Sequence, residues 1–124
     1  MCGIIVHFGD QHPEGDTTPP LTHRGPDGFR KETLGKCRME FTRLAINDTS
    51  EAGMQPFVRS NEMLVCNGEI YNHKEFETGD ELSGSDCECI INMLHQHGIH
   101  ETCNLIRGVF AFAWTDGDRL LVAR

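Results

Sequence analysis

The sequence predicts a single α+β domain with a largely antiparallel sheet. Short apolar runs bounded by turn residues predict strands, one amphipathic stretch with start and stop signals predicts a helix, and a hairpin signal lies near the end. The 124 residues are enough for one core, and no repeat, linker or change of composition divides them. We therefore expect short strands and one or two helices around a common core.

The N-terminal part of the chain contains two predicted strands separated by a long loop. Residues 2–8 (CGIIVHF) form a near-continuous apolar run rich in β-branched residues, as in a buried strand. Residues 9–28 hold four of the five prolines and several turn residues, which predicts a loop without a helix of several turns. Apolar and polar side chains then alternate through residues 37–42, as in a half-buried strand.

The C-terminal half contains a strand, the helix and the hairpin. Residues 62–68 (EMLVCNG) are an apolar run ending on glycine, which predicts a strand followed directly by a tight turn. Ser85 and Glu88 have the spacing of a capping box, and the apolar stripe after them predicts a helix that ends at Gly98. Apolar runs on both sides of residues 116–117 (Asp-Gly) predict a hairpin.

Charge and hydropathy exclude several classes of function. The net charge of -8, from 11 Lys and Arg against 19 Asp and Glu, disfavours a nucleic-acid partner. No apolar run approaches the roughly 18 residues of a membrane span, and the first residues lack the features of a secretory signal. We therefore expect no membrane partner and a location in the cytosol, where the six cysteines stay reduced; a disulfide scaffold is the weaker alternative.

Cys2 is the first candidate for a catalytic residue. Removal of an initiator methionine before a small side chain is common, and it would give Cys2 a free α-amine with a pKa of about 7.7–8. Such an amine is a suitable general base for the thiol of the same residue, so no catalytic histidine is needed. The alternative is an ordinary buried thiol that packs as a small apolar side chain.

Seven sequence blocks, in the order found in a known family, favour the catalytic interpretation of Cys2. The blocks resemble the N-terminal glutaminase domain of asparagine synthetases, a class II (N-terminal nucleophile) glutamine amidotransferase, and they read MCGII, HRGPDG, RLAIND, MQPF, NGEIYNHKEF, GSDCE and GVFAFAWTDGDRLLVAR. The resemblance covers nearly the whole chain. It implies an Ntn-hydrolase-like sandwich of mainly antiparallel sheets with helices, hydrolysis of L-glutamine to glutamate and ammonia, and no cofactor.

The resemblance also implies a role for each matching residue. Cys2 attacks the glutamine carboxamide and forms a thioester, while the amide of Asn67 and the backbone N–H of Gly68 form the oxyanion hole. Arg43 binds the substrate α-carboxylate, and Glu69 with Asp86 binds the α-ammonium. Backbone groups of the pocket are implied at Leu44, Ile46 and Asn47, the last in place of an apolar residue common in the family.

The HRGPD block, residues 23–27, is a specific marker of the family, but its residue types do not show whether its role is structural or catalytic. We expect Arg24 and Asp27 to form a structural ion pair that holds the loop over the pocket, rather than to take part directly in catalysis, because no step of the reaction lacks a catalyst. His23 is left out of the catalytic set.

Three departures from the family pattern limit what can be transferred. Residues 9–22 cannot form the helix of several turns that the family carries there, and the segment 77–83 is shorter than usual. The sequence ends where the family continues into closing strands and a synthetase domain. We therefore expect residues 1–124 to be an incomplete glutamine amidotransferase domain that does not make asparagine alone, and whose open sheet edge pairs with a synthetase partner or a second copy.

Two alternatives from other classes remain. The first is a degenerate glutaminase fold that acts through partner binding, which would explain the missing segments. The second is a metal-binding module, but residues two apart on a helix point in opposite directions and cannot bind one zinc as a pair. The residues concerned are Cys87, Cys89, His95, His97, His100 and Cys103. We expect Cys87 to lie with Ile91 and Leu94 in the core, the three histidines to be solvated, and no metal site.

Overall fold

The computed structural model describes residues 2–15, 17, 19–46 and 48–124 of the chain. The first sheet has three strands in the order β1-β3-β2, and the second has four in the order β4-β5-β6-β7; every pair of neighbours is antiparallel. The strands are β1 Gly3–Phe8, β2 Gly28–Leu34, β3 Cys37–Arg43, β4 Phe57–Arg59, β5 Glu62–Ile70, β6 Gly108–Thr115 and β7 Leu120–Ala123. The helix α1 spans Cys89–Leu105, and the short 3-10 helices of the described residues are η1 Pro19–Arg24, η2 Glu51–Gly53, η3 His73–Phe76 and η4 Asp86–Glu88.

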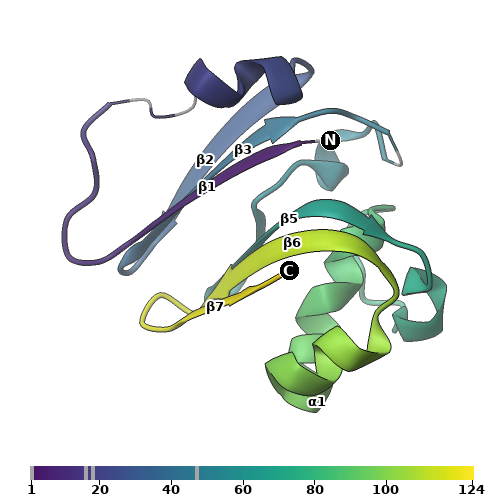
Figure 1. Cartoon of the computed structure of the whole chain (residues 1–124). Coiled ribbons are helices and arrows are strands. Elements are labelled where there is room, and N and C mark those ends of the chain that lie inside the picture. Colours follow the sequence, from purple (N-terminus) through teal and green to yellow (C-terminus); the bar gives the residue numbers. More distant parts are fainter. Residues whose placement is uncertain (1, 16, 18, 47) are drawn as a thin grey trace.

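The two sheets lie face to face, and α1 covers the outer face of the second sheet (Figure 1). One apolar core fills the space between the sheets, with Met39 and Phe41 of β3 against Met63 and Val65 of β5. A second core lies between β5, β6 and α1. The predicted α+β class with antiparallel sheets is therefore confirmed, as is the burial of Cys87, Ile91 and Leu94 in the core.

The strand predicted at residues 37–42 is present, but the expectation that it is half-buried is wrong. All seven residues of β3 are buried, because β3 is the central strand of its sheet and both of its faces are covered. On the outer face Arg38 and Glu40 form an ion pair at 2.7 Å, and Thr17 donates a hydrogen bond to Glu40 at 2.8 Å. Alternation in sequence separates the two faces of a strand, but it does not show whether a loop covers the polar face.

The first strand and the loop after it differ in detail from the prediction. β1 forms as expected, but most of it is half-buried rather than buried, since it lies at an edge of its sheet. The long loop contains η1, which packs on the first sheet (Figure 1). It begins with two prolines, whose fixed φ suits the first turn of a helix. The strand β2 was not predicted; its alternating pattern GFRKETL is polar, and it lies at the other edge.

β5 continues to Ile70, so the turn predicted directly after Gly68 is wrong by two residues. Gly68 has φ 154 within the strand, and a Cβ built there would lie 2.0 Å from the carbonyl oxygen of Val109 on β6. Glycine is needed at this position because the two strand backbones approach each other too closely for a side chain. The hairpin between β6 and β7 forms as predicted.

The helix prediction is confirmed for its core but not for its start. The backbone of Gly98 is non-helical (φ 74, ψ 173), so the first helical segment ends there as predicted, and a second one continues to Leu105. Ser85 makes no capping hydrogen bond from its side chain. The carboxylate of Glu88 instead accepts the N–H groups of Leu82 and Ser83, both at 2.9 Å. Among the described residues, no helix is long and apolar enough to cross a membrane.

Candidate active site

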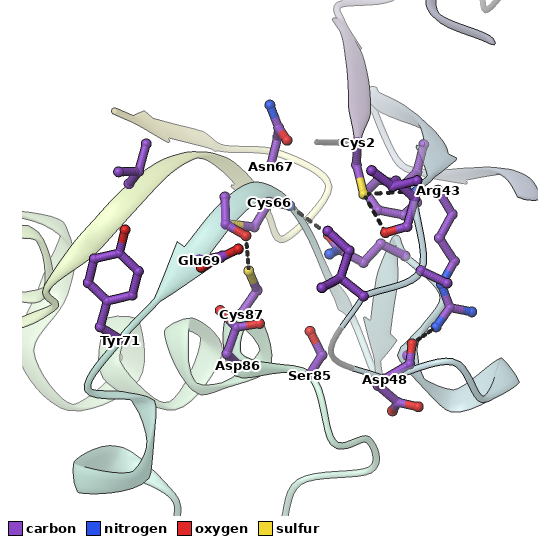
Figure 2. Close-up of a pocket in the computed structure, with 18 residues that line it drawn as sticks. Cys2, Arg43, Asp48, Cys66, Asn67, Glu69, Tyr71, Ser85, Asp86 and Cys87 are labelled. Atoms are coloured by element: carbon purple, nitrogen blue, oxygen red, sulfur yellow. Dashed lines mark hydrogen bonds between the residues drawn. The ribbon is translucent and has the colours of Figure 1, made fainter. Parts of the chain in front are cut away.

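A pocket of about 270 Å³ lies between the two sheets, at the end where the apolar core gives way to polar side chains. Cys2 and Arg43 lie on one side of it, and residues of β5 and η4 lie on the other (Figure 2). Eight of the nine site residues named from the sequence line this one pocket. They are Cys2, Arg43, Leu44, Ile46, Asn67, Gly68, Glu69 and Asp86.

The thiol of Cys2 enters the pocket from the start of β1. Its Sγ accepts the N–H of Leu44 at 3.2 Å and lies 3.6 Å from the carbonyl oxygen of the same residue. Arg24 donates to the Cys2 carbonyl at 3.3 Å. These contacts hold the sulfur at one place on the pocket wall.

Arg43 ends β3 and is buried, with 6% of its surface exposed. Its Nη1 donates to the carbonyl of Ser50 at 2.7 Å, and its Nη2 donates to the carbonyl of Asp48. The guanidinium is thus held by the turn that follows it in the sequence. A fixed, planar cation on a pocket wall is suited to binding a carboxylate.

The opposite wall is formed by residues 66–69 of β5. The side-chain oxygen of Asn67 is buried and accepts no hydrogen bond from any residue that the structure describes. The backbone of Gly68 faces the pocket. No other residue fits at this position, because a Cβ would collide with the backbone of β6. The wall therefore combines an amide side chain with a backbone segment free of side-chain bulk.

Two carboxylates lie beside this wall. Asp86 is buried, and its Oδ2 accepts the N–H of Ile70 at 2.6 Å, which fixes η4 against β5. Glu69 is exposed and lines the same pocket. Leu44 and Ile46 form the rim next to Arg43, with Ile46 60% exposed. Asn47 lies outside the described residues.

The expected ion pair between Arg24 and Asp27 is not among the contacts of the described residues. Asp27 instead accepts the N–H of Ala45 at 2.9 Å, and Arg24 binds the Cys2 carbonyl. Each side chain is bound by a backbone group next to a strand of the first sheet, the Cys2 carbonyl before β1 and the Ala45 N–H after β3. The two residues still fasten the loop to the pocket wall, each through its own partner.

For several residues that line the pocket, the sequence analysis predicted no role there. Gln55 accepts the N–H of Cys66 at 2.6 Å, and Asp48 accepts that of Gly84 at 2.8 Å. No spacing pattern marks them, because each acts across a contact between segments distant in the sequence. The others are Phe41, Ala45, Gly53, Tyr71, Ser85, Cys87 and Val109.

Two buried thiols near the pocket, those of Cys87 and Cys89, are protonated at neutral pH. A hydrogen bond with Cys66 and burial raise the pKa of Cys87 well above its ordinary value, and burial raises the pKa of Cys89 to about 12. Buried neutral thiols of this kind are poor nucleophiles. Among the described residues, no group of three or more His, Cys, Asp or Glu side chains is placed to hold a metal ion.

Comparison with known proteins gives a consistent result. The family described as a glutamine amidotransferase domain matches residues 1–124. The chain is 38% identical over 131 residues to the glutamine-hydrolysing asparagine synthetase of Homo sapiens, covering 94% of the chain and 23% of that protein. It is 33% identical over 129 residues to the same enzyme of Sandersonia aurantiaca, covering 94% and 24%.

A viral relative matches the full chain. The probable glutamine-hydrolysing asparagine synthetase of Acanthamoeba polyphaga mimivirus is 35% identical over 140 residues, covering 100% of the chain and 26% of that protein. The chain thus spans about a quarter of the length of the curated relatives it matches.

Proposed function

The chain belongs to the glutamine amidotransferase domain family, and from this premise we propose that it hydrolyses L-glutamine to L-glutamate and ammonia with Cys2 as the nucleophile. The observation that carries the proposal is the convergence of Cys2, Arg43, Asn67 and Asp86 on one pocket between the sheets. These residues come from different strands and from η4, so their meeting is a property of the fold rather than of a single sequence segment.

The proposed nucleophile and base belong to the same residue. After removal of Met1, the α-amine of Cys2 takes the thiol proton, directly or through a water, and the thiolate attacks the carboxamide carbon of glutamine. The tetrahedral intermediate collapses to a thioester as ammonia leaves with a proton from the amine. Water then attacks the thioester, glutamate leaves, and the thiol is restored.

The opposite wall supplies the proposed oxyanion hole. The side-chain amide of Asn67 and the backbone N–H of Gly68 donate to the oxygen that becomes negative in the tetrahedral intermediate. Donors fixed on a strand need little rearrangement when this charge develops. The position of both residues on the pocket wall supports the assignment, because donors that line a partly dehydrated pocket interact more strongly with a developing charge.

The remaining charged residues are proposed to bind the amino-acid head group of the substrate. Arg43 binds the α-carboxylate, and Glu69 and Asp86 bind the α-ammonium. Backbone groups at Leu44 and Ile46 complete the pocket on the Arg43 side. The cation and the carboxylates lie on opposite walls, which matches the separation of charges in a zwitterionic head group (Figure 2).

The fate of the ammonia is proposed by analogy with the relatives. Because these are named asparagine synthetases, we propose that the ammonia serves amide synthesis of the asparagine type, in the cytosol. The synthesis itself would take place on a synthetase domain or partner, or in an assembly with a second copy, and residues 1–124 would be the glutaminase part. Such a partner would pair at an edge strand of one of the sheets, which are β1 and β2 in the first sheet and β4 and β7 in the second.

The test is a glutaminase assay on three forms of the protein. Protein with verified removal of Met1 is incubated with glutamine, beside the Cys2→Ala variant and a form that retains Met1. We expect glutamate release from the first form only, with a loss of at least about 10³-fold in the other two. Equal background in all three, with the fold intact, would instead favour a degenerate module that acts through a partner.

A further inference from the structure

The carboxylate of Asp48 touches both walls of the pocket. On its own wall, Oδ1 accepts the N–H of Ser50 at 2.8 Å. The carbonyl groups of Asp48 and Ser50 in turn accept the guanidinium of Arg43. One short turn therefore holds both Arg43 and the Asp48 carboxylate in place.

On the opposite wall, Oδ2 of Asp48 accepts the N–H of Gly84 at 2.8 Å. Gly84 lies two residues before Asp86, which is itself fixed to β5 by its hydrogen bond with Ile70. Hydrogen bonds thus join Arg43 to Asp48 and Asp48 to Gly84, and two residues of backbone lead from Gly84 to Asp86. Figure 2 shows Asp48 at the end of the pocket where the segments carrying Arg43 and Ser85 approach each other.

The residues around the Asp48 carboxylate leave space for it and stabilise its charge. A Cβ at Gly53 would lie 2.8 Å from two carbon atoms of the Asp48 side chain and 2.9 Å from Nη2 of Arg43. Hydrogen bonds from the Ser50 hydroxyl and from the N–H groups of Gly84 and Ser50 lower the pKa of Asp48, so it is ionised at neutral pH. An ionised carboxylate accepts on both oxygens at once, which an amide side chain cannot do.

We infer that Asp48 is a positioning residue that sets the separation between Arg43 and Asp86, and with it the affinity for the head group of glutamine. The inference rests on the proposed function. Asp48 makes no contact with Cys2 among the described interactions, so it acts on substrate binding rather than on bond breaking. Its loss is expected to change KM more than kcat.

The test compares Asp48→Asn with Asp116→Asn, a matched control. Asp116 also accepts two backbone N–H groups, from Asp118 at 3.1 Å and Arg119 at 2.8 Å, but in the β6–β7 hairpin away from the pocket. For Asp48→Asn we expect KM for glutamine to rise at least tenfold, with kcat within about threefold of the wild type. For Asp116→Asn we expect both constants to stay within about twofold.

A second measurement needs no substrate. Hydrogen exchange of the Gly84 amide is expected to speed up at least tenfold in Asp48→Asn and to stay unchanged in Asp116→Asn. Equal KM values in the two variants, or unchanged exchange at Gly84, would overturn the inference. If the wild type releases no glutamate, the proposed function fails, and exchange at Gly84 still decides whether Asp48 joins the two walls.

Discussion

The two faces of β5 are packed in different ways. On the face toward α1, Leu64, Cys66 and Ile70 are buried in a continuous apolar core. On the face toward the first sheet, Met63 and Val65 are followed by polar residues that line the pocket. The face that is packed throughout provides stability, and the other leaves space and polar groups for a ligand. Substitutions on the two faces should therefore separate stability from substrate binding.

Gly68→Ala should have the largest effect, because Gly68 belongs to the strand that both faces share. Its Cβ would lie 2.0 Å from the Val109 carbonyl and 2.6 Å from Cα of Phe110, and neither backbone can move without separating β5 from β6. We expect destabilisation above about 4 kcal/mol, measured by urea unfolding. The control is Gly79→Ala, where φ is also positive but no atom lies within 4 Å of the new Cβ. A Gly68→Ala protein as stable as that control would contradict the close approach of the strands.

Ile90→Ala tests the α1 face alone. Ile90 is fully buried against β5, so its truncation should lower the free energy of unfolding by about 2–5 kcal/mol. KM for glutamine should stay within about twofold under conditions where the variant is folded, because Ile90 does not line the pocket. Val122→Ala, at a side chain that is 63% exposed, should cost less than about 0.5 kcal/mol. A raised KM in Ile90→Ala would show that the two faces are coupled.

Alkaline pH should weaken the α1 face. Burial raises the pKa of Cys89 to about 12 from 9.0, so between these values the folded state retains a proton that the unfolded state has lost. The stabilising contribution is complete below pH 9 and decreases as the pH rises, by up to about 1.4 kcal/mol per pH unit for this thiol. Urea unfolding at a series of pH values measures this slope. Cys89→Ala should reduce it, and an equal slope in that variant would exclude Cys89 as its source.

His95→Ala should have the smallest effect of the series. His95 lies on the exposed side of α1, where its Nε2 pairs with Glu62 at 2.8 Å while 60% of its side chain is exposed. Water screens an exposed pair of this kind, so we expect a loss below about 1 kcal/mol in urea unfolding. Glu62 also accepts the indole N–H of Trp114 at 2.7 Å and would keep that partner. A larger loss of unfolding free energy would mean that His95 contributes to the packed core.

Local sequence patterns correctly predicted those elements whose conformation depends on residues close to one another in the sequence. The β6–β7 hairpin and the helix break at Gly98 both follow from backbone preferences at one or two residues, and both were found where predicted. The capping box at Ser85 failed because Glu88 has better partners. Its carboxylate is held by the N–H groups of Leu82 and Ser83 and by Arg59 at 2.6 Å. The choice between these partners depends on where β4 places Arg59.

The residues of the candidate site also fall into two groups, those predicted from the sequence and those found only in the structure. The site residues from Cys2 to Asp86 were predicted from sequence blocks that resemble a known family, because the role proposed for each depends on its residue type. Asp48 and Gln55 were not singled out, since each carries its role through a hydrogen bond to a distant segment, at Gly84 and Cys66. A pair of this kind leaves no periodic signal in one sequence.

The sequence by itself determined the α+β class, the positions of most strands, and eight of the residues that line the pocket. Only the tertiary structure decided that β3 is buried on both faces, that Arg24 and Asp27 bind separate backbone partners, and that Asp48 spans the pocket. The physical reason is the range of the interactions involved. Periodicity and turn preference act within a few residues, whereas the partner of a buried charge or backbone N–H is set by how two sheets pack against each other.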